Sequence, residues 1–340
     1  MKKMISFLIA AAMVAVLLSG CGKAEEPSSS SAAGKDGAAD KVSIVSTIFT
    51  PYDFARQIAG DKAEVTMLLP PASESHSYEP TPQDVIKIQN CDMFLYVGGE
   101  SDVWVNEVLE SMDTSNMTIV TLMDCVEVVE EEIVEGMEDD EHEHEEEEHA
   151  EGEEEHSESE AEEEAEYDEH VWTSPKNAER IVQKISDALC SADAANAAYY
   201  KQNTTAYLVQ LEELDTAFQE VVDNAARKTI VLGDRFPFRY LADAYGLDYF
   251  AAFPGCSTET EASAATVAFL IDKIKDEKIP VIFHIELSNQ RMAGTIAEAT
   301  GAKVLELHAC HNITKEDFEN GMTYLDLMKR NVDALKEALE

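Results

Sequence analysis

Basic residues are scarce in this sequence of 340 residues, which has 25 Lys and Arg against 69 Asp and Glu and a formal net charge of −44. A protein that binds nucleic acid needs a basic surface to displace counterions from the phosphates. Lys and Arg do not cluster outside the extreme N-terminus, so nucleic acid is not an expected partner. Apolar residues still make up 45% of the chain, which excludes wholesale disorder, and the length fits two domains.

Several catalytic and thiol motifs are also missing. The six cysteines include no CxxC pair, which argues against a thiolate zinc cluster and against a thioredoxin-type redox site. The sequence has neither an HExxH segment nor a GxSxG nucleophile elbow, the signatures of many zinc proteases and of α/β-hydrolases. Cys256 and Cys310 lie at the ends of apolar runs, and in an exported protein they could form a disulfide or remain free.

The first 20 residues have the features of an export signal, with Lys2 and Lys3 at the start, an apolar run over residues 4–18 and small residues after it. The sequence Leu18-Ser19-Gly20-Cys21 resembles a bacterial lipobox, in which Cys21 is lipidated and becomes the mature N-terminus. A plain secretory signal with an incidental cysteine is the alternative. Residues 21–40 are rich in Ser, Ala and Gly and are expected to form a flexible tether to a membrane anchor on the extracytoplasmic face.

A strongly acidic tract lies near the middle of the chain. Residues 127–169 contain 26 Asp or Glu and no Lys or Arg, a composition that predicts a disordered, self-repelling loop. The tract also contains His142, His144, His149 and His156. Imidazoles among many carboxylates would bind divalent ions weakly and could collect them for a tighter site. A solvated loop without a specific role is the alternative.

From residue 42 onward, short β-branched runs alternate with helical stretches, which is typical of an α/β fold with mainly parallel strands. Strands are expected at residues 42–46, 63–69, 93–97, 118–121, 229–232, 249–253, 281–285 and 304–307. Residues 194–226 lack Gly and Pro and keep helical apolar spacing, which predicts one long helix, and a last helix is expected near residues 315–339.

These elements predict two similar lobes, each a mainly parallel four-stranded sheet flanked by helices. The N-terminal lobe would comprise residues 41–193, including the acidic tract, and the C-terminal lobe residues 227–340. The long helix of residues 194–226 would join them rigidly. In open parallel sheets, ligands bind beyond the carboxyl ends of the strands, so the two sets of strand ends would face one another.

Five of the nine histidines lie outside the acidic tract, and all five are expected near these strand ends or directly after the tract. They are His76, His170, His284, His308 and His311. The polar residues Asp234, Arg235 and Glu286 also fall near strand ends. Such a distribution indicates a metal ion between the lobes.

Two of these histidines begin segments with a specific pattern. The first is His76-Ser77-Tyr78-Glu79-Pro80-Thr81-Pro82-Gln83-Asp84, followed by Gly98-Gly99-Glu100 and Trp104, and the second is His170-Val171-Trp172-Thr173-Ser174-Pro175-Lys176-Asn177-Ala178. Together they resemble the metal-binding lipoproteins of bacterial ABC importers for zinc and manganese, the ZnuA-like family of cluster A-I. The resemblance covers most of the chain from Val42 onward.

The resemblance implies two lobes linked by a long rigid helix, with one divalent ion at their interface and no reaction chemistry. It also implies delivery of the ion to a membrane permease powered by a cytoplasmic ATPase, and we expect the chain to act as a monomer. Zinc-binding members of the family often carry a His-rich and acidic loop before the second ligand. Residues 127–169 match that loop in place and composition.

The chain departs from the family pattern at two positions. In Gly233-Asp234-Arg235-Phe236-Pro237-Phe238-Arg239-Tyr240, Arg235 aligns where the family usually has a His or Glu ligand, and an arginine cannot bind a cation. The family's final carboxylate aligns near His308, and a histidine can replace it. The expected ligands are therefore His76, His170, His308 and, for the vacant position, His284. His284 could instead be a buried histidine with ordinary partners, whereas His311, Glu286 and Asp234 could ligate or support the ligands.

Three or four imidazoles with little carboxylate suit Zn²⁺ in tetrahedral geometry, whereas Mn²⁺ prefers more oxygen. The expected function is zinc capture for an ABC importer. Two other classes stay open. A lipid-anchored metallohydrolase could use three histidines, an open fourth position and a carboxylate such as Glu286. A surface zinc buffer or adhesin would bind the metal without delivering it to a permease.

Overall fold

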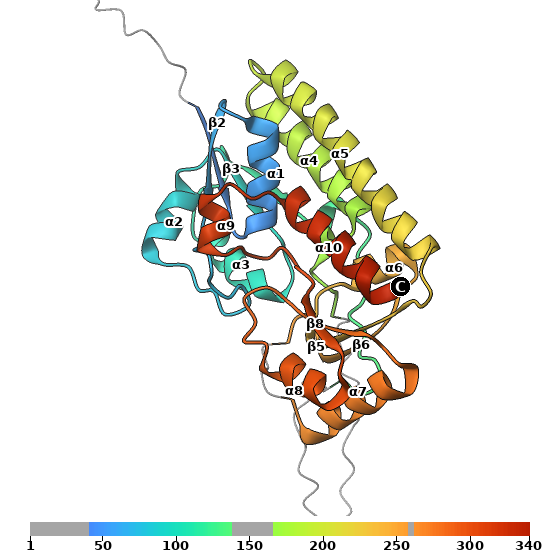
Figure 1. Ribbon diagram of the computed structural model, residues 1–340. Coiled ribbons are helices and arrows are strands. Elements are labelled where there is room, and N and C mark those ends of the chain that lie inside the picture. The colour runs from blue at the N-terminus through green and yellow to red at the C-terminus, as the bar shows by residue number, and fades with distance from the viewer. Residues whose placement is uncertain (1–40, 138–165, 258–261) are drawn as a thin grey trace, which may run out of the picture. The chain divides into compact units, whose positions relative to one another are not determined.

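Figure 1 shows the computed structural model of the protein, which describes residues 41–137, 166–257 and 262–340. The expected signal peptide, the tether and Cys21 lie outside the described residues, as do His142, His144, His149 and His156 of the acidic tract. Within the described part, no helix combines the length and the apolar character that crossing a membrane requires.

The first lobe is built on a parallel sheet of four strands in the order β2-β1-β3-β4. Because parallel neighbours cannot be joined by tight turns, a helix lies in each connection. The strands are β1 (Val42–Ser46), β2 (Ala63–Met67), β3 (Met93–Tyr96) and β4 (Thr118–Thr121), and the helices are α1 (Phe49–Ala59), α2 (Pro82–Gln89) and α3 (Val103–Glu110). Thr81 and Pro82 start α2, because Thr81 forms a capping box with Asp84.

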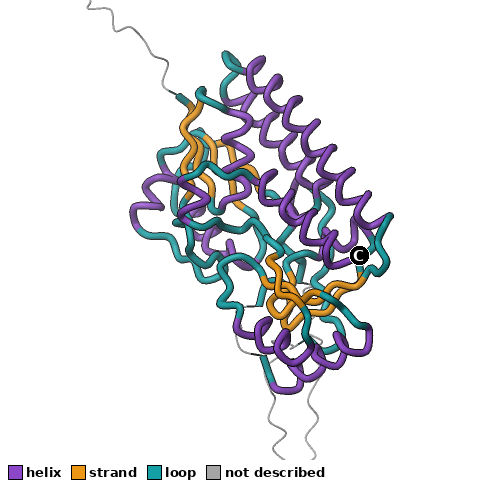
Figure 2. Tube along the Cα trace, viewed as in Figure 1, coloured by secondary structure: helices purple, strands orange, loops and turns teal. Residues whose placement is uncertain are grey.

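The second lobe repeats this arrangement, with a parallel sheet in the order β6-β5-β7-β8. Its strands are β5 (Thr229–Phe236), β6 (Asp248–Pro254), β7 (Val281–His284) and β8 (Lys303–Glu306), and its helices are α6 (Arg239–Tyr245), α7 (Ala264–Glu277) and α8 (Arg291–Thr300). The expected fold of two similar α/β lobes is confirmed. Figure 2 shows the two groups of strands set apart from one another beside the long helices.

The long helix between the lobes is α5 (Ala197–Asp223), which packs against α4 (Pro175–Ala192) and α1. Its buried residues recur every three or four positions, as in Tyr207, Leu211, Leu214 and Phe218. Leu211 belongs to one cluster of buried apolar residues that also contains Ile44 of β1 and Phe283 of β7. The two lobes therefore share a continuous core along α5.

The last helix differs from the expectation of one helix over residues 315–339. The chain forms α9 (Lys315–Glu319) and α10 (Tyr324–Leu339). Gly321 has a φ of 73°, and Thr323 begins α10 with a capping box to Asp326, so the helix stops and restarts. The backbone N–H of Tyr324 then donates to the buried carboxylate of Asp53 in α1, which returns the C-terminal helix to the first lobe.

The ends of the acidic tract are folded, so the expectation of disorder over all of residues 127–169 is wrong for residues 127–137 and 166–169. Glu130 and Tyr167 form an antiparallel bridge, and the N–H of Asp168 donates to the carbonyl of Val129. Val129 packs against the core, and its N–H donates to the hydroxyl of Tyr240 in α6. Apolar side chains within the tract thus fix its ends to the second lobe.

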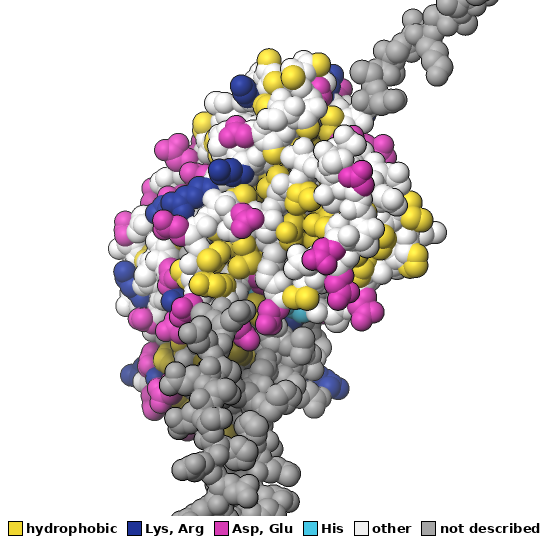
Figure 3. Space-filling model, turned by 180° about the vertical axis from the view of Figure 1, so that it is seen from behind, with side chains coloured by type: hydrophobic (Ala, Val, Ile, Leu, Met, Phe, Trp, Pro, Cys, Tyr) yellow, Lys and Arg dark blue, Asp and Glu magenta, His cyan; other side chains and the backbone are white. Residues whose placement is uncertain are grey.

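On the face in Figure 3, Lys and Arg are interspersed with Asp and Glu.

Candidate metal centre

His76 lies in the irregular segment between β2 and α2, where prolines at both ends prevent regular structure. Its side chain is only 4% exposed. The ring Nδ1 lies 2.8 Å from the Oγ of Ser101, and the Ser101 hydroxyl donates to Glu169. With that hydroxyl proton committed to Glu169, the imidazole Nδ1 donates to Ser101 and its Nε2 carries the lone pair.

His170 directly follows the folded end of the acidic tract and precedes the short 3-10 helix Val171–Thr173. The ring is fully buried, and its Nδ1 lies 3.0 Å from an Asp168 carboxylate oxygen that also accepts the N–H of His170. The backbone at Gly255 passes against this ring. A Cβ at Gly255 would lie 3.0 Å from the Cε1 of His170, so a larger residue there would displace the ring.

His311 lies in the loop after β8, and its side chain is 9% exposed. Its Nδ1 lies 3.4 Å from the carboxylate of Glu286, which also accepts the N–H groups of Ala309 and His311. The first lobe holds the same loop, because the N–H of Phe49 donates to the carbonyl of His311. The residue before it, Cys310, has a φ of 64° and turns the loop toward the first lobe.

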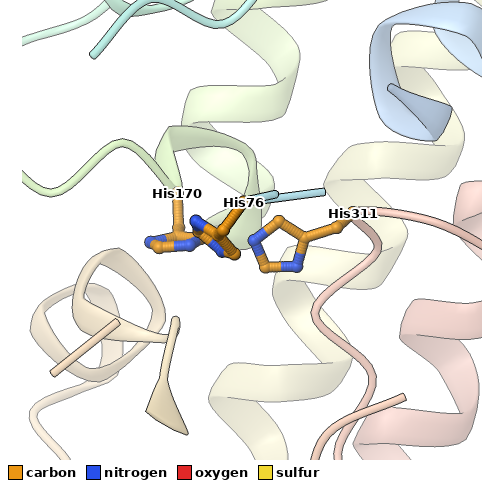
Figure 4. Close-up of side chains that lie close together, drawn as sticks. All are labelled: His76, His170 and His311. Atoms are coloured by element: carbon orange, nitrogen blue, oxygen red, sulfur yellow. The ribbon is translucent and has the colours of Figure 1, made fainter. Parts of the chain in front are cut away.

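The structure brings these three imidazoles together (Figure 4). The ring centroids are 5.7 Å apart for His76 and His170, 5.2 Å for His76 and His311, and 4.7 Å for His170 and His311. One ligand atom from each residue lies within 4.8 Å of the others. The Nε2 atoms of all three rings are buried without a hydrogen-bond partner in the described structure. A buried unpaired acceptor costs about 1–3 kcal/mol, and a bound cation would satisfy all three.

The other expected ligands are not part of this triad. The ring Nδ1 of His284 lies 2.8 Å from the carbonyl of Ile285. The Nδ1 of His308 accepts the N–H of Cys310 and lies 3.6 Å from Glu286. A carboxylate oxygen of Asp234 accepts the N–H of Arg235. The turn at Cys310 separates His308 from His311, so that the later histidine reaches His76 and His170.

Glu286 and Asp168 support the triad rather than belong to it, as the partners of ligand histidines usually do. Burial by itself would favour the protonated form of Glu286, but His308, His311 and the N–H of Ala309 lower its pKa to about 2. Glu286 is therefore a carboxylate that can accept a proton from the Nδ1 of His311. Asp168 stands in the sequence pattern Asp-x-His, a signal from which its role could have been predicted.

The three imidazoles differ in how readily they become protonated. Burial, followed by the charges of His311, His170 and Arg235, holds the pKa of His76 well below its ordinary value. Burial also lowers the pKa of His311, although Glu286 opposes this. For His170 burial acts in the same direction, but the carboxylates around it, Asp168 first, outweigh burial and raise its pKa.

A second group adjoins the triad and shares His170 with it. Ligand atoms of Glu169, His170 and Cys256 lie within 4.8 Å of one another. Burial and the nearby carboxylates of Glu169 and Glu131 raise the pKa of the Cys256 thiol, so it is protonated at neutral pH. All five described cysteines are free, and the disulfide considered between Cys256 and Cys310 is therefore not formed.

A family model described as ZnuA, zinc-uptake complex component A periplasmic, matches residues 44–338. The chain belongs to this family. It is 34% identical over 333 residues to the high-affinity zinc uptake system protein ZnuA of Bacillus subtilis, covering 98% of this chain and 96% of that protein.

Two solved structures of family members are similar in fold. The Zn(II)-bound ZnuA-like domain of Streptococcus pneumoniae AdcA is 30% identical with a TM-score of 0.70, and the match covers 88% of this chain and 99% of that one. The metal-dependent lipoprotein YcdH of Bacillus subtilis is 30% identical with a TM-score of 0.71, covering 88% and 100%. The family and fold expected from the two histidine motifs are thus confirmed.

Removing one histidine at a time distinguishes the triad from the other expected ligands. We expect His311→Ala to weaken zinc binding by more than about 100-fold, because the loss of a ligand exceeds the usual 10- to 100-fold effect of a supporting residue. His284→Ala should change it by less than about tenfold, since its ring contacts a carbonyl outside the triad. Competition against a chromogenic chelator measures both. An effect of His284→Ala or His308→Ala equal to that of His311→Ala would contradict the triad.

Protonation of His170 should set the pH dependence of zinc binding. Zinc binds only neutral imidazole, and a raised pKa means that protons compete for His170 already above the ordinary imidazole pKa of about 6.5. The lowered pKa values keep His76 and His311 neutral there. Affinity should therefore begin to fall above about pH 6.5 as the solution is acidified.

The Asp168→Asn variant tests this assignment, because it removes the carboxylate that most raises the pKa of His170. The onset of the fall should move to lower pH in calorimetric titrations, whatever the change in absolute affinity. Asp187→Asn on the exposed face of α4 is the matched control and should leave the profile unchanged. Identical profiles for Asp168→Asn and the native protein would show that another group sets the pH dependence.

Proposed function

We propose that His76, His170 and His311 hold Zn²⁺ between the two lobes, and that the chain delivers this ion to the permease of an ABC importer. Its family is that of the substrate-binding component of zinc-uptake ABC systems, a transport role rather than an enzymatic one. The observation that supports the ligand set is the meeting of three buried Nε2 atoms without partners.

The donor chemistry favours zinc over manganese. Three imidazole nitrogens are borderline-soft ligands that suit tetrahedral Zn²⁺, and they leave one position for water or a carboxylate. The carboxylates nearest the triad already have partners, since Glu169 accepts from Ser101 and Glu286 accepts from Ala309. The triad therefore lacks the oxygen-rich coordination shell that Mn²⁺ prefers. The solved AdcA domain is Zn(II)-bound, in keeping with this choice.

Calorimetry on residues 41–340 should find one tight zinc site per chain, with manganese binding much more weakly. Deleting residues 138–165 should preserve the tight site and remove only weak sites, if that part of the acidic tract collects ions. The deletion must spare residues 127–137 and 166–169, because these ends pack beside His170. Loss of the tight site on deletion would instead make the tract the principal zinc binder.

We also propose that Cys21 carries the lipid that anchors the chain, as a monomer, to the extracytoplasmic face of the cell membrane, with the importer's permease and cytoplasmic ATPase as partners. The lipobox-like sequence before Cys21 and the description of YcdH as a lipoprotein support this proposal. A zinc buffer without a transport role would have the same site. Zinc uptake by cells lacking the gene distinguishes the two functions, because uptake should fall only if the protein serves an importer.

Replacing Cys21 with Ser should release the protein from the membrane, because a serine hydroxyl cannot form the thioether through which the lipid is attached. Fractionation of bacterial cells that express each form, followed by detection of the protein, measures this. Cys190→Ser is the control, since this cysteine lies in α4 of the folded part, and it should stay with the membrane. Retention of the Cys21→Ser form in the membrane fraction would contradict lipid anchoring through this residue.

A further inference from the structure

Arg235 stands where the family pattern places a metal ligand, yet its guanidinium binds two other groups. Its Nη1 donates to the carbonyl of Ser257 at 3.1 Å. Its Nη2 lies 3.2 Å from each carboxylate oxygen of Glu74. The Arg235 side chain is 11% exposed and that of Glu74 is 47% exposed. The ion pair therefore joins the end of β5, in the second lobe, to the segment that carries His76 in the first.

Glu74 links this arginine to the backbone of a proposed zinc ligand. One of the two Glu74 oxygens near Arg235, Oε1, also accepts the N–H of Ser75 at 3.1 Å and that of His76 at 3.4 Å. A movement of Glu74 away from Arg235 would therefore shift the backbone at His76. Through one carboxylate, the second lobe holds the position of a first-lobe ligand.

A second set of contacts fastens the earlier part of the same segment. The amide of Asn312 donates to the carbonyls of Pro70 and Ser73, both at 2.8 Å, and the N–H of Ala72 donates to the carbonyl of Ile313 at 2.8 Å. Asn312 follows His311 directly, so these bonds tie the segment to the loop that carries another ligand. Asn312 thus fixes residues 70–73, and Arg235 fixes the next residue, Glu74.

We propose that Arg235 is a positioning residue, whose ion pair with Glu74 latches the His76 segment onto the second lobe and slows zinc release. The proposal rests on the ligand role of His76 given above. The ion pair is the part of this attachment most open to solvent, and breaking it removes the contact with the second lobe that lies nearest to His76 along the segment. Release would then begin at this latch rather than by separation of the lobes, which share a core.

A simple charge effect predicts the opposite result, which makes the sign of the change decisive. The positive charge of Arg235 repels Zn²⁺, so removing that charge alone would slow zinc release. Loss of the latch would accelerate release despite this. A partly exposed ion pair of ordinary strength corresponds to a change of about two- to fivefold.

The experiment follows zinc transfer from the loaded protein to an excess of chromogenic chelator by stopped flow. Arg235→Ala and Glu74→Gln should each accelerate release about two- to fivefold, and the double variant should be no faster than either, because both remove the same contact. Added salt should accelerate release from the native protein more than from Arg235→Ala. Arg235→Lys keeps the charge without the planar fork, so its rate of zinc release should lie between those of the native protein and Arg235→Ala.

Arg330→Ala is the matched control, since Arg330 forms an exposed ion pair with Asp317 away from the triad and should leave release unchanged. Slower or unchanged release from Arg235→Ala overturns the latch, whatever the result for Glu74→Gln, because loss of a negative charge alone would also accelerate release. If Arg235→Ala does not fold, Arg235→Gln decides by the same sign, because it also removes the positive charge and the planar fork but keeps more of the side chain. A native protein without a tight zinc site refutes the proposed function, whereas one tight site with release indifferent to both variants refutes only the latch.

Discussion

To bind zinc as proposed, each of the three buried imidazoles must keep the lone pair of its Nε2 free, and the groups around the triad meet this requirement. A ring nitrogen without a proton is available only when the other nitrogen has an acceptor for its own proton. Asp168 provides that acceptor for His170 and Glu286 provides it for His311. For His76 the acceptor is the Ser101 hydroxyl, which in turn donates its own proton to Glu169. Burying these carboxylates would be costly without donors, which explains why backbone N–H groups converge on Glu286.

The fold fixes where these groups can meet. The three rings come from the segment after β2, the end of the acidic tract and the loop after β8. These segments are far apart in the sequence, so the rings meet only when both lobes are folded. The shared core along α5 makes separation of the lobes expensive, since it would expose buried apolar surface. Any change at the site therefore falls on the irregular segments, and the one carrying His76 is held mainly by polar contacts.

Sequence reasoning reached the strands and the family because both depend on local patterns. The strands predicted at residues 42–46 and 118–121 have the bounds that the structure shows. The choice between His308 and His311 could not be made this way. The two lie three residues apart after the same strand, and a left-handed turn at Cys310, together with Glu286 just after β7, determines which one lies beside His76 and His170.

Charge compensation around the triad explains how an arginine can stand beside a cation site. Neutral imidazoles leave the two positive charges of Zn²⁺ uncompensated, and an unpaired arginine would add a third. Glu74 neutralises Arg235, while the buried carboxylates of Asp168, Glu169 and Glu286 surround the rings with negative charge. Because hydrogen bonds already occupy these carboxylates, they can stabilise the ion through the field without becoming its ligands. In the proposed site, oxygen atoms supply the negative charge and nitrogen atoms the coordination, a combination that favours zinc over cations that require an oxygen shell.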